Sequence, residues 1–230
     1  MPDTLHERRL RRGRRWWDLV SPVHGSAGGQ TTRVAEVALT HLALGPGAVV
    51  LDLGCGSGAA LSTLSAAVGP TGRVVGIDHS PKMLARADAV VRGNGLANVE
   101  LRRADATRTE IGHGAFDAVY ACASISAMPD VPAVLAAVRT ALRPGGRLFV
   151  FDMRLVPRGW STPVIAVLRG VYAAGAGFAG VDVLDTARAV FDDVTLPDFP
   201  GQEGRGQPDG GWPPLTMFVA RTAVSSGSAP

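Results

Sequence analysis

Residues 50–58 read Val-Leu-Asp-Leu-Gly-Cys-Gly-Ser-Gly, and this stretch decides the fold. The apolar run that begins at Ala48 enters a cluster of glycines, which is typical of a buried strand that leads into a tight turn. Residues 59–68 then carry a helical pattern that ends at Gly69-Pro70. The stretch therefore predicts a strand, a glycine turn and a helix in succession.

The same alternation of strand and helix continues on the C-terminal side. Residues 73–78 form the next apolar run, and Ser80-Pro81 supplies the N-cap and first residue of a helix that stops near Gly93. Further strands are expected over residues 99–102, 116–120 and 147–152, with a helix over residues 131–142. Apolar strands separated by helices predict a parallel sheet covered on both faces, and right-handed crossovers make it doubly wound.

Three further segments flank these units. A helix is expected before the first strand, over residues 31–44, and an apolar stretch rich in glycine and alanine spans residues 162–180. A final pair of strands is expected around Val194 and residues 217–220, with a long turn over residues 201–214 between them. By their position, we expect residues 16–44 and 153–182 to be helical cap segments, with residues 16–24 and 153–182 over the acceptor pocket.

The chain has 230 residues, of which 46% are hydrophobic and 19% charged, and this composition suits one globular domain. We expect a flexible basic arm over residues 1–15, a single domain over residues 16–223 and a flexible tail over residues 224–230. Six arginines give the arm a net charge of +4, so the rest of the chain sums to about −1. A nearly neutral body argues against a nucleic-acid partner. The arm can instead meet acidic lipid headgroups, although a solvated tail is the alternative.

The cellular compartment follows from what is missing in the sequence. Cys55 and Cys122 are too few for a multi-bridge framework, and no apolar stretch after the N-terminal arginines forms a signal peptide, so we expect a cytoplasmic protein. The most apolar segment, residues 162–183, is interrupted by Arg169 and Asp182 and falls short of the roughly 18–20 apolar residues of a membrane-spanning helix. No cluster of His, Cys and Asp has metal-ligand spacing, so no metal is expected.

The glycine turn indicates a ligand, because ligands of doubly wound sheets bind at the carboxyl edge of the strands. Gly54 and Gly56 let the backbone approach a ligand closely, and with Ala59 they also satisfy the loose dinucleotide-binding pattern. Asp52 separates the two cofactors, since a carboxylate there opposes a pyrophosphate but favours a ligand that carries an ammonium. The turn also lacks a Lys or Arg to neutralise phosphates. It therefore favours S-adenosylmethionine over NAD.

Two further carboxylates follow the next two strands. Asp78 ends the second strand, where it can accept hydrogen bonds from both ribose hydroxyls of either cofactor. Asp105 follows the third strand and can accept from an adenine amino group, while Ala104 and Ala106 leave room for the ring. The alternative for Asp105 is a helix cap.

Five segments, in order along the chain, resemble the class I S-adenosylmethionine-dependent methyltransferases, in particular the small-molecule branch that includes the ubiquinone and menaquinone C-methyltransferases. They are residues 50–58, 76–84, 104–106, 116–119 and 142–148, and the resemblance covers roughly residues 16–152. It implies an α/β, doubly wound, Rossmann-like sheet of seven strands in the order 3-2-1-4-5-7-6.

The resemblance also implies cofactor contacts around the methionine moiety, the ribose and the adenine. Around the methionine moiety they are Asp52, Gly54, Gly56 and Gly58. Asp78 binds the ribose, and Asp105 and Ala106 flank the adenine. His79 and Met83 lie on the side of the ribose and adenine.

Four more residues are candidates for the site. Residues 17–24 are similar to the family's Tyr-Asp-x-x-Ser/Ala-x-x-Tyr segment, which folds over the cofactor, with Trp17 and His24 in place of the tyrosines. Cys55 lies within the glycine turn, and the resemblance implies that Cys122, at the end of the fourth strand, faces the cleft. Both cysteines are counted as candidate cofactor contacts, with packing as the alternative.

The sequence also narrows the reaction. Residues 121–124 read Ala-Cys-Ala-Ser in place of the Asn/Asp-Pro-Pro-Tyr/Phe motif of amino-directed nucleic-acid methyltransferases, and arsenite methyltransferases need more thiols than two cysteines supply. We therefore expect methylation of a small molecule at O, N or C. Trp16, Trp17, Trp160 and Tyr172 favour an apolar or aromatic acceptor, although these rings can equally pack the flanking segments onto the sheet.

His24 is the candidate catalytic base, because imidazole suits proton transfer near neutral pH and the resemblance places this segment beside the cofactor. A contact with substrate or cofactor without proton transfer is the alternative. Two other functions stay open. One is a protein of the same fold that binds S-adenosylmethionine but catalyses a cyclisation or decarboxylation, and the other is a noncatalytic partner subunit that binds the cofactor for stability. The oligomeric state is left open.

Overall fold

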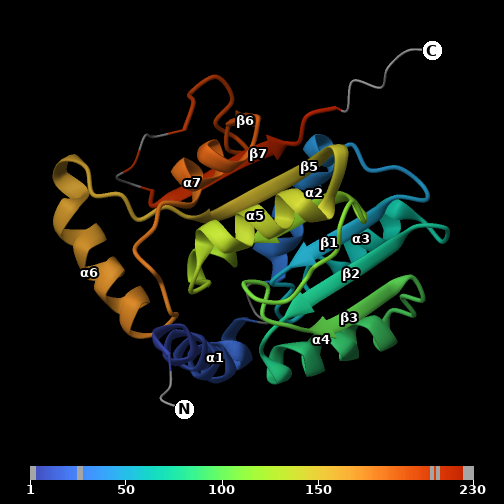
Figure 1. Cartoon of the computed structure of the whole chain (residues 1–230), viewed down its shortest axis with the longest axis horizontal. Helices are drawn as coiled ribbons and strands as arrows, with labels where there is room; N and C mark the ends of the chain where they lie inside the picture. Colours follow the sequence, from blue (N-terminus) through green and yellow to red (C-terminus); the bar gives the residue numbers. More distant parts are fainter. Residues whose placement is uncertain (1–3, 25–27, 208–209, 211–212, 225–230) are drawn as a thin grey trace.

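In the described part of the chain, seven strands form one sheet in the order β3-β2-β1-β4-β5-β7-β6, as the resemblance implies (Figure 1). The computed structural model describes residues 4–24, 28–207, 210 and 213–224, with the backbone alone over residues 20–24 and 28–31. The strands are β1 (Val49–Leu53), β2 (Arg73–Asp78), β3 (Val99–Arg103), β4 (Phe116–Cys122), β5 (Leu142–Met153), β6 (Asp193–Thr195) and β7 (Leu215–Arg221). β1 to β5 pair in parallel, whereas β7 runs antiparallel between β5 and β6.

Helices cover both faces of the sheet, which confirms the doubly wound fold (Figure 1). The α-helices of the described residues are α1 (Leu5–His24), α2 (Gly28–Leu42), α3 (Leu61–Val68), α4 (Pro81–Gly93), α5 (Val131–Ala141), α6 (Thr162–Ala174) and α7 (Val183–Val190), and all but α1 and α6 lie on the faces of the sheet. Because successive residues of a strand point to opposite faces, Val50 joins the layer under α2, α3 and α4, and Leu51 joins the layer under α5 and α7. Each fully buried Leu or Val contributes roughly 1.5–3 kcal/mol.

Side-chain caps set where two helices beside the carboxyl edge begin. Ser80 Oγ accepts a hydrogen bond of 3.1 Å from Met83 N, and Pro81 lies in the first turn of α4. Asp130 caps α5 in the same way, through a bond of 3.0 Å from Ala133 N. Such a cap stabilises a helix by about 1 kcal/mol. Both helices begin where the sequence predicts.

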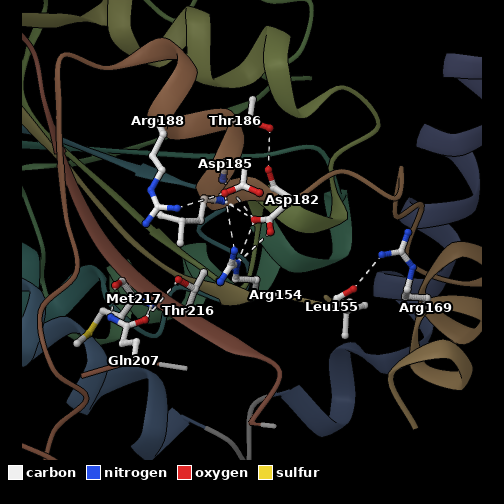
Figure 2. Close-up of polar contacts among 11 residues, drawn as sticks. Arg154, Leu155, Arg169, Asp182, Asp185, Thr186, Arg188, Gln207, Thr216 and Met217 are labelled. Atoms are coloured by element: carbon white, nitrogen blue, oxygen red, sulfur yellow. Dashed lines mark hydrogen bonds and ion pairs between the residues drawn. The ribbon is translucent and has the colours of Figure 1, made fainter. Parts of the chain in front are cut away.

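A buried ion pair joins the end of β5 to α7 (Figure 2). Arg154 is 5% exposed, and its Nε lies 3.0 Å from Asp182 Oδ2. Asp182 also caps α7, because its Oδ1 accepts a bond of 2.9 Å from Leu184 N. The pair joins the two ends of the segment of residues 154–182, which contains α6.

The structure differs from the flexible arm expected over residues 1–15, because residues 5–15 belong to α1. That helix is anchored at three places: Asp18 Oδ1 accepts from Ser80 Oγ at 2.5 Å, Arg12 Nη1 donates to Ala173 O at 3.1 Å, and His6 Nε2 lies 3.0 Å from Asp105 Oδ2. The count of arginines did not reveal this, since a helix can expose a basic side while its opposite side packs.

The expected cap over residues 16–44 is divided between two places. α2 lies on the face of the sheet, where Ala35, Ala38 and Leu42 are buried, and only the α1 part stands at the carboxyl edge. The expected tail lies outside the described residues beyond Val224. No helix among the described residues is both long and apolar enough to cross a membrane.

Candidate active site

Two adjoining cavities lie at the carboxyl ends of β1, β2 and β4, with volumes of about 150 Å³ and about 40 Å³. Both are lined by Gly54, Asp78, His79, Ala127 and Met128. A larger surface hollow, of about 740 Å³, lies at the opposite edge of the sheet, between residues 69–73 and 95–100. That hollow contains none of the candidate site residues, so the carboxyl edge is where the predicted chemistry can take place.

The glycine turn is held against the end of β2 by backbone hydrogen bonds. Gly54 N and Cys55 N both donate to Ile77 O, at 2.8 and 3.0 Å. Gly56 N donates to Asp78 Oδ2 at 3.0 Å. A Cβ on Gly56 would meet only Gly54 O, at 4.0 Å, so the space before Gly56 is open to a ligand.

Asp78 is the carboxylate that ties the turn to α4. Its Oδ1 accepts a bond of 2.7 Å from Ser80 N, while Oδ2 accepts from Gly56 N. Burial raises the pKa of Asp78, and the hydrogen bonds from Ser80 and Gly56 only partly offset that effect. The Nδ1 atom of His79 lies 3.8 Å from Asp78 Oδ1, and the buried Nε2 has no hydrogen-bond partner among the described residues. His79 Nε2 is therefore an unpartnered polar atom beside Asp78, at the point where the two cavities join.

Asp105 borders the smaller cavity and is already engaged by α1. His6 Nε2 lies 3.0 Å from Asp105 Oδ2, and Thr107 Oγ1 donates to Oδ1 at 2.5 Å. Burial alone would raise the pKa of Asp105, but the hydrogen bonds from Thr107 and His6 outweigh it and lower the pKa. Arg9, Leu10 and Gly13 of α1 line the same cavity. Its 40 Å³ is close to the share of one water molecule in the liquid, about 30 Å³.

Asp52 lies behind the turn and lines neither cavity. It is 2% exposed, and its Oδ2 has no partner among the described residues, nor does the hydroxyl of Tyr120, which is its register partner on β4. Burial, with a smaller contribution from Asp78, raises the pKa of Asp52 to about 8. A buried carboxyl without a partner favours the protonated form at neutral pH, and a nearby cation would favour the charged form.

The two cysteines line the larger cavity as protonated thiols. Burial raises the pKa of Cys122 to about 12, and it raises the pKa of Cys55 well above its usual value. Because a thiolate is the reactive form, neither residue is suited to be a nucleophile.

The structure therefore brings most of the candidate residues together. Those that line one or both cavities are Trp17, Gly54, Cys55, Gly56, Asp78, His79, Met83, Asp105, Ala106 and Cys122. Asp52 and Gly58 stand apart from the cavity walls, and Gly58 instead packs against α4, where an added Cβ would lie 3.0 Å from Ala87 Cα. His24 ends α1, and its side chain lies outside the described residues. No residue of the expected lid over 153–182 lines either cavity.

Sequence reasoning missed two groups of lining residues. One is the N-terminal half of α1, with Arg9, Leu10 and Gly13, which gave no motif signal. The other is the segment after β4, in which Ala123 has a positive φ of 49° and Ser124 Oγ donates to Leu53 O at 2.8 Å. This segment follows the carboxyl end of a central strand, and that position could have marked it as part of the ligand site.

The residues at the larger cavity fit S-adenosylmethionine. The unpartnered His79 Nε2 and the open space before Gly56 both point to a polar ligand there. At the adenine end, His6 Nε2 already lies 3.0 Å from Asp105 Oδ2, and a hollow of about 370 Å³ lies between α1 and residues 103–105. An adenine amino group would therefore compete with His6 for Asp105 Oδ2.

A doubly wound sheet in this strand order, with a glycine turn after β1 and carboxylates after β2 and β3, defines the Rossmann-like methyltransferase fold. Residues 50–146 match the family described as "Methyltransferase domain". Over these residues the chain therefore contains a methyltransferase domain, and the resemblance drawn from the five segments is confirmed.

Named relatives match this domain over part of their length. The nocamycin O-methyltransferase of Saccharothrix syringae is 42% identical over 103 residues, which are 45% of this chain and 37% of that protein. The demethylmenaquinone methyltransferase of Lactococcus lactis is 36% identical over 106 residues, 46% of this chain and 42% of that protein. The chain thus spans less than half of either relative. The solved structure of the [4+2]-cyclase SpnF has the same fold, with a TM-score of 0.67, 20% identity, and coverage of 94% of this chain and 97% of that one.

Proposed function

We propose that this protein transfers the methyl group of S-adenosylmethionine to an O, N or C atom of a small apolar or aromatic molecule. The observation that carries the proposal is the convergence of Gly56, Asp78, His79 and Met83, from three successive segments, on one cavity at the carboxyl edge of a methyltransferase domain. When bound, the cofactor supplies a methyl group on a sulfonium, which is already activated for displacement.

In this proposal each residue has a definite task. Asp78 holds the ribose hydroxyls while it keeps the glycine turn in place through Gly56 N. Trp17 and Met128 form apolar walls of the larger cavity, which exclude water and orient the acceptor. Asp52 stabilises an ammonium group from behind the turn once its carboxyl is charged.

The acceptor class rests on the cavity wall and on the relatives. Asp78 and His79 are the acidic and basic side chains that line the larger cavity, and most of the other lining residues are apolar. An O-methyltransferase and a demethylmenaquinone methyltransferase among the relatives support a phenolic or quinol-like acceptor.

Binding and turnover test this proposal separately. Calorimetry with S-adenosylhomocysteine and with NAD should show binding of the former alone, and Asp78→Ala should weaken it by at least tenfold, since a hydrogen bond to a charged group contributes about 1.5–3 kcal/mol. Asp88→Ala on the outside of α4 is the matched control and should leave affinity unchanged. Binding of NAD without the sulfur nucleoside would overturn the assignment.

His24 is the proposed general base. If it takes a proton from the acceptor, His24→Ala should lower the single-turnover rate by roughly 10²–10⁴-fold and leave the affinity for S-adenosylhomocysteine nearly intact. An unchanged chemical rate would end this assignment while leaving methyl transfer itself in place.

A non-methylating reaction is the second candidate, because SpnF has this fold over nearly its whole length and is a [4+2]-cyclase. The two candidates differ in whether the cofactor is consumed. Formation of one S-adenosylhomocysteine per product supports methyl transfer, whereas product formation with intact S-adenosylmethionine supports the second. If no product forms by either route, the result supports the noncatalytic partner subunit. We also propose a cytoplasmic location, which the free thiols of Cys55 and Cys122 support.

A further inference from the structure

α6 presents an apolar, uncharged surface to solvent. Of its 13 residues, only Ile165 is buried. Val164, Val167 and Val171 are exposed at a spacing of three or four residues, and the exposed Trp160 lies in the 3₁₀ turn of residues 159–161 directly before α6. Residues at this spacing lie along one side of a helix. Trp160 is 76% exposed and Val167 is 67% exposed, which is unusual for side chains of this size and polarity.

The charged residue of α6 does not interrupt this surface. Arg169 turns toward the body of the protein, where its Nη1 donates to Leu155 O at 2.9 Å (Figure 2). Its guanidinium also lies 5.6 Å from the centre of the Phe178 ring. The inner side of α6 packs on a small cluster that includes Leu155, Ile165 and Phe178. The outer side therefore has no packing role in the described chain.

α1 places a basic surface beside this apolar one. Arg8, Arg12 and Arg15 are exposed and lie on one side of the helix, with exposed Leu5 and Leu19 in line with them at its two ends. Arg12 also joins the two helices, since it donates to Ala173 O in the last turn of α6. Both helices stand beyond the carboxyl ends of the parallel strands, at the end of the molecule that holds the cavities (Figure 1).

We propose that these two helices form a docking surface for a membrane that contains anionic lipids. The docking surface consists of Trp160, Val164, Val167 and Val171 around α6, and Leu5, Arg8, Arg12, Arg15 and Leu19 on α1. An anionic bilayer offers both things that this surface lacks: an apolar phase for the valines and tryptophan, and negative headgroups for the arginines.

Charge argues against a second copy of the chain as the occupant. A two-fold contact through α6 would bring the arginine rows of two α1 helices toward each other, and like charges in an interface oppose association. A docked membrane would also lie at the end of the protein that holds the cavities. The docking itself does not depend on the reaction, and its test is independent of methyl transfer.

Vesicle sedimentation tests the proposal with the whole chain. The protein should pellet with vesicles of phosphatidylcholine mixed with phosphatidylglycerol and bind pure phosphatidylcholine far more weakly. Raising the salt from about 0.1 to 1 M should release it, because the Debye length falls from about 10 to 3 Å. Trp160 should shift its emission to shorter wavelength on binding, and the shift should be absent in Trp160→Phe.

Paired variants separate the two parts of the surface. Val167→Asp should weaken binding by more than tenfold, whereas Val224→Asp, at an exposed apolar position near the opposite edge, should not change it. Arg8→Gln combined with Arg15→Gln should weaken binding about fivefold for each arginine. Arg92→Gln combined with Arg139→Gln removes the same charge from α4 and α5 and should have little effect.

Four results would overturn the proposal. One is failure of the wild-type chain to bind anionic vesicles, and another is equal loss of binding in Val167→Asp and Val224→Asp. The third is a dimer in sedimentation velocity that Val167→Asp dissociates, together with no vesicle binding, since this would assign α6 to contact between copies. Binding of an acidic protein in place of vesicles would likewise overturn it.

Discussion

Gly56 and Gly58 stand two residues apart in the same turn, yet the structure gives them different tasks. Both have positive φ angles, of 53° and 86°, so alanine at either position costs about 1–2 kcal/mol in backbone strain. A Cβ on Gly58 would also lie 2.9 Å from Leu61 Cδ1 and 3.0 Å from Ala87 Cα. Overpacking of this kind adds roughly 1–3 kcal/mol, whereas a Cβ on Gly56 meets open space.

The two alanine variants should therefore separate stability from binding. Gly58→Ala should lower the free energy of unfolding by about 2–5 kcal/mol and keep the affinity of the folded protein for S-adenosylhomocysteine. Gly56→Ala should cost about 1–2 kcal/mol of stability but weaken binding by tenfold or more, because its methyl group enters the cavity.

Urea unfolding and calorimetry on the two variants are sufficient to decide. Calorimetry is performed at a temperature where both variants are folded, as judged by circular dichroism. Equal losses of stability would refute the packing role of Gly58. A loss of affinity in Gly58→Ala with retained affinity in Gly56→Ala would refute the placement of the ligand in front of Gly56.

Three other predictions follow from buried polar groups. Because the pKa of Asp52 is raised in the folded protein, its contribution to stability is full below the unfolded value near 4 and is lost as pH rises toward about 8; urea unfolding of Asp52→Asn should lack this part of the pH dependence. His6→Ala should raise the affinity for S-adenosylhomocysteine about 2–10-fold in calorimetry, since His6 no longer competes with the ligand for Asp105; unchanged or weaker binding would contradict this competition. Arg154→Ala should destabilise the fold by about 3–5 kcal/mol in urea unfolding, against less than about 1 kcal/mol for the exposed Arg188→Ala.

The fold could be predicted because its signals are local and repeated. The glycine turn after β1 and the Ser80-Pro81 start of α4 each depend on a few neighbouring residues, and the structure has both where they were expected. The order of the strands in the sheet does not depend on neighbouring residues alone. It was predicted from the resemblance of the five segments to the family. Most of the residues predicted to bind the cofactor lie together around the two cavities, because the carboxyl ends of parallel strands meet at one edge.

What only the tertiary structure decided is how separate segments meet. The sequence by itself determined a sheet of known order, a glycine turn and the carboxylates Asp78 and Asp105 at its edge. It could not show that His6, about a hundred positions away, lies against Asp105, or that Gly58 faces α4 and not the cavity. These contacts depend on how whole helices pack, and a composition rich in arginine describes a basic tail and the outer side of a docked helix equally well.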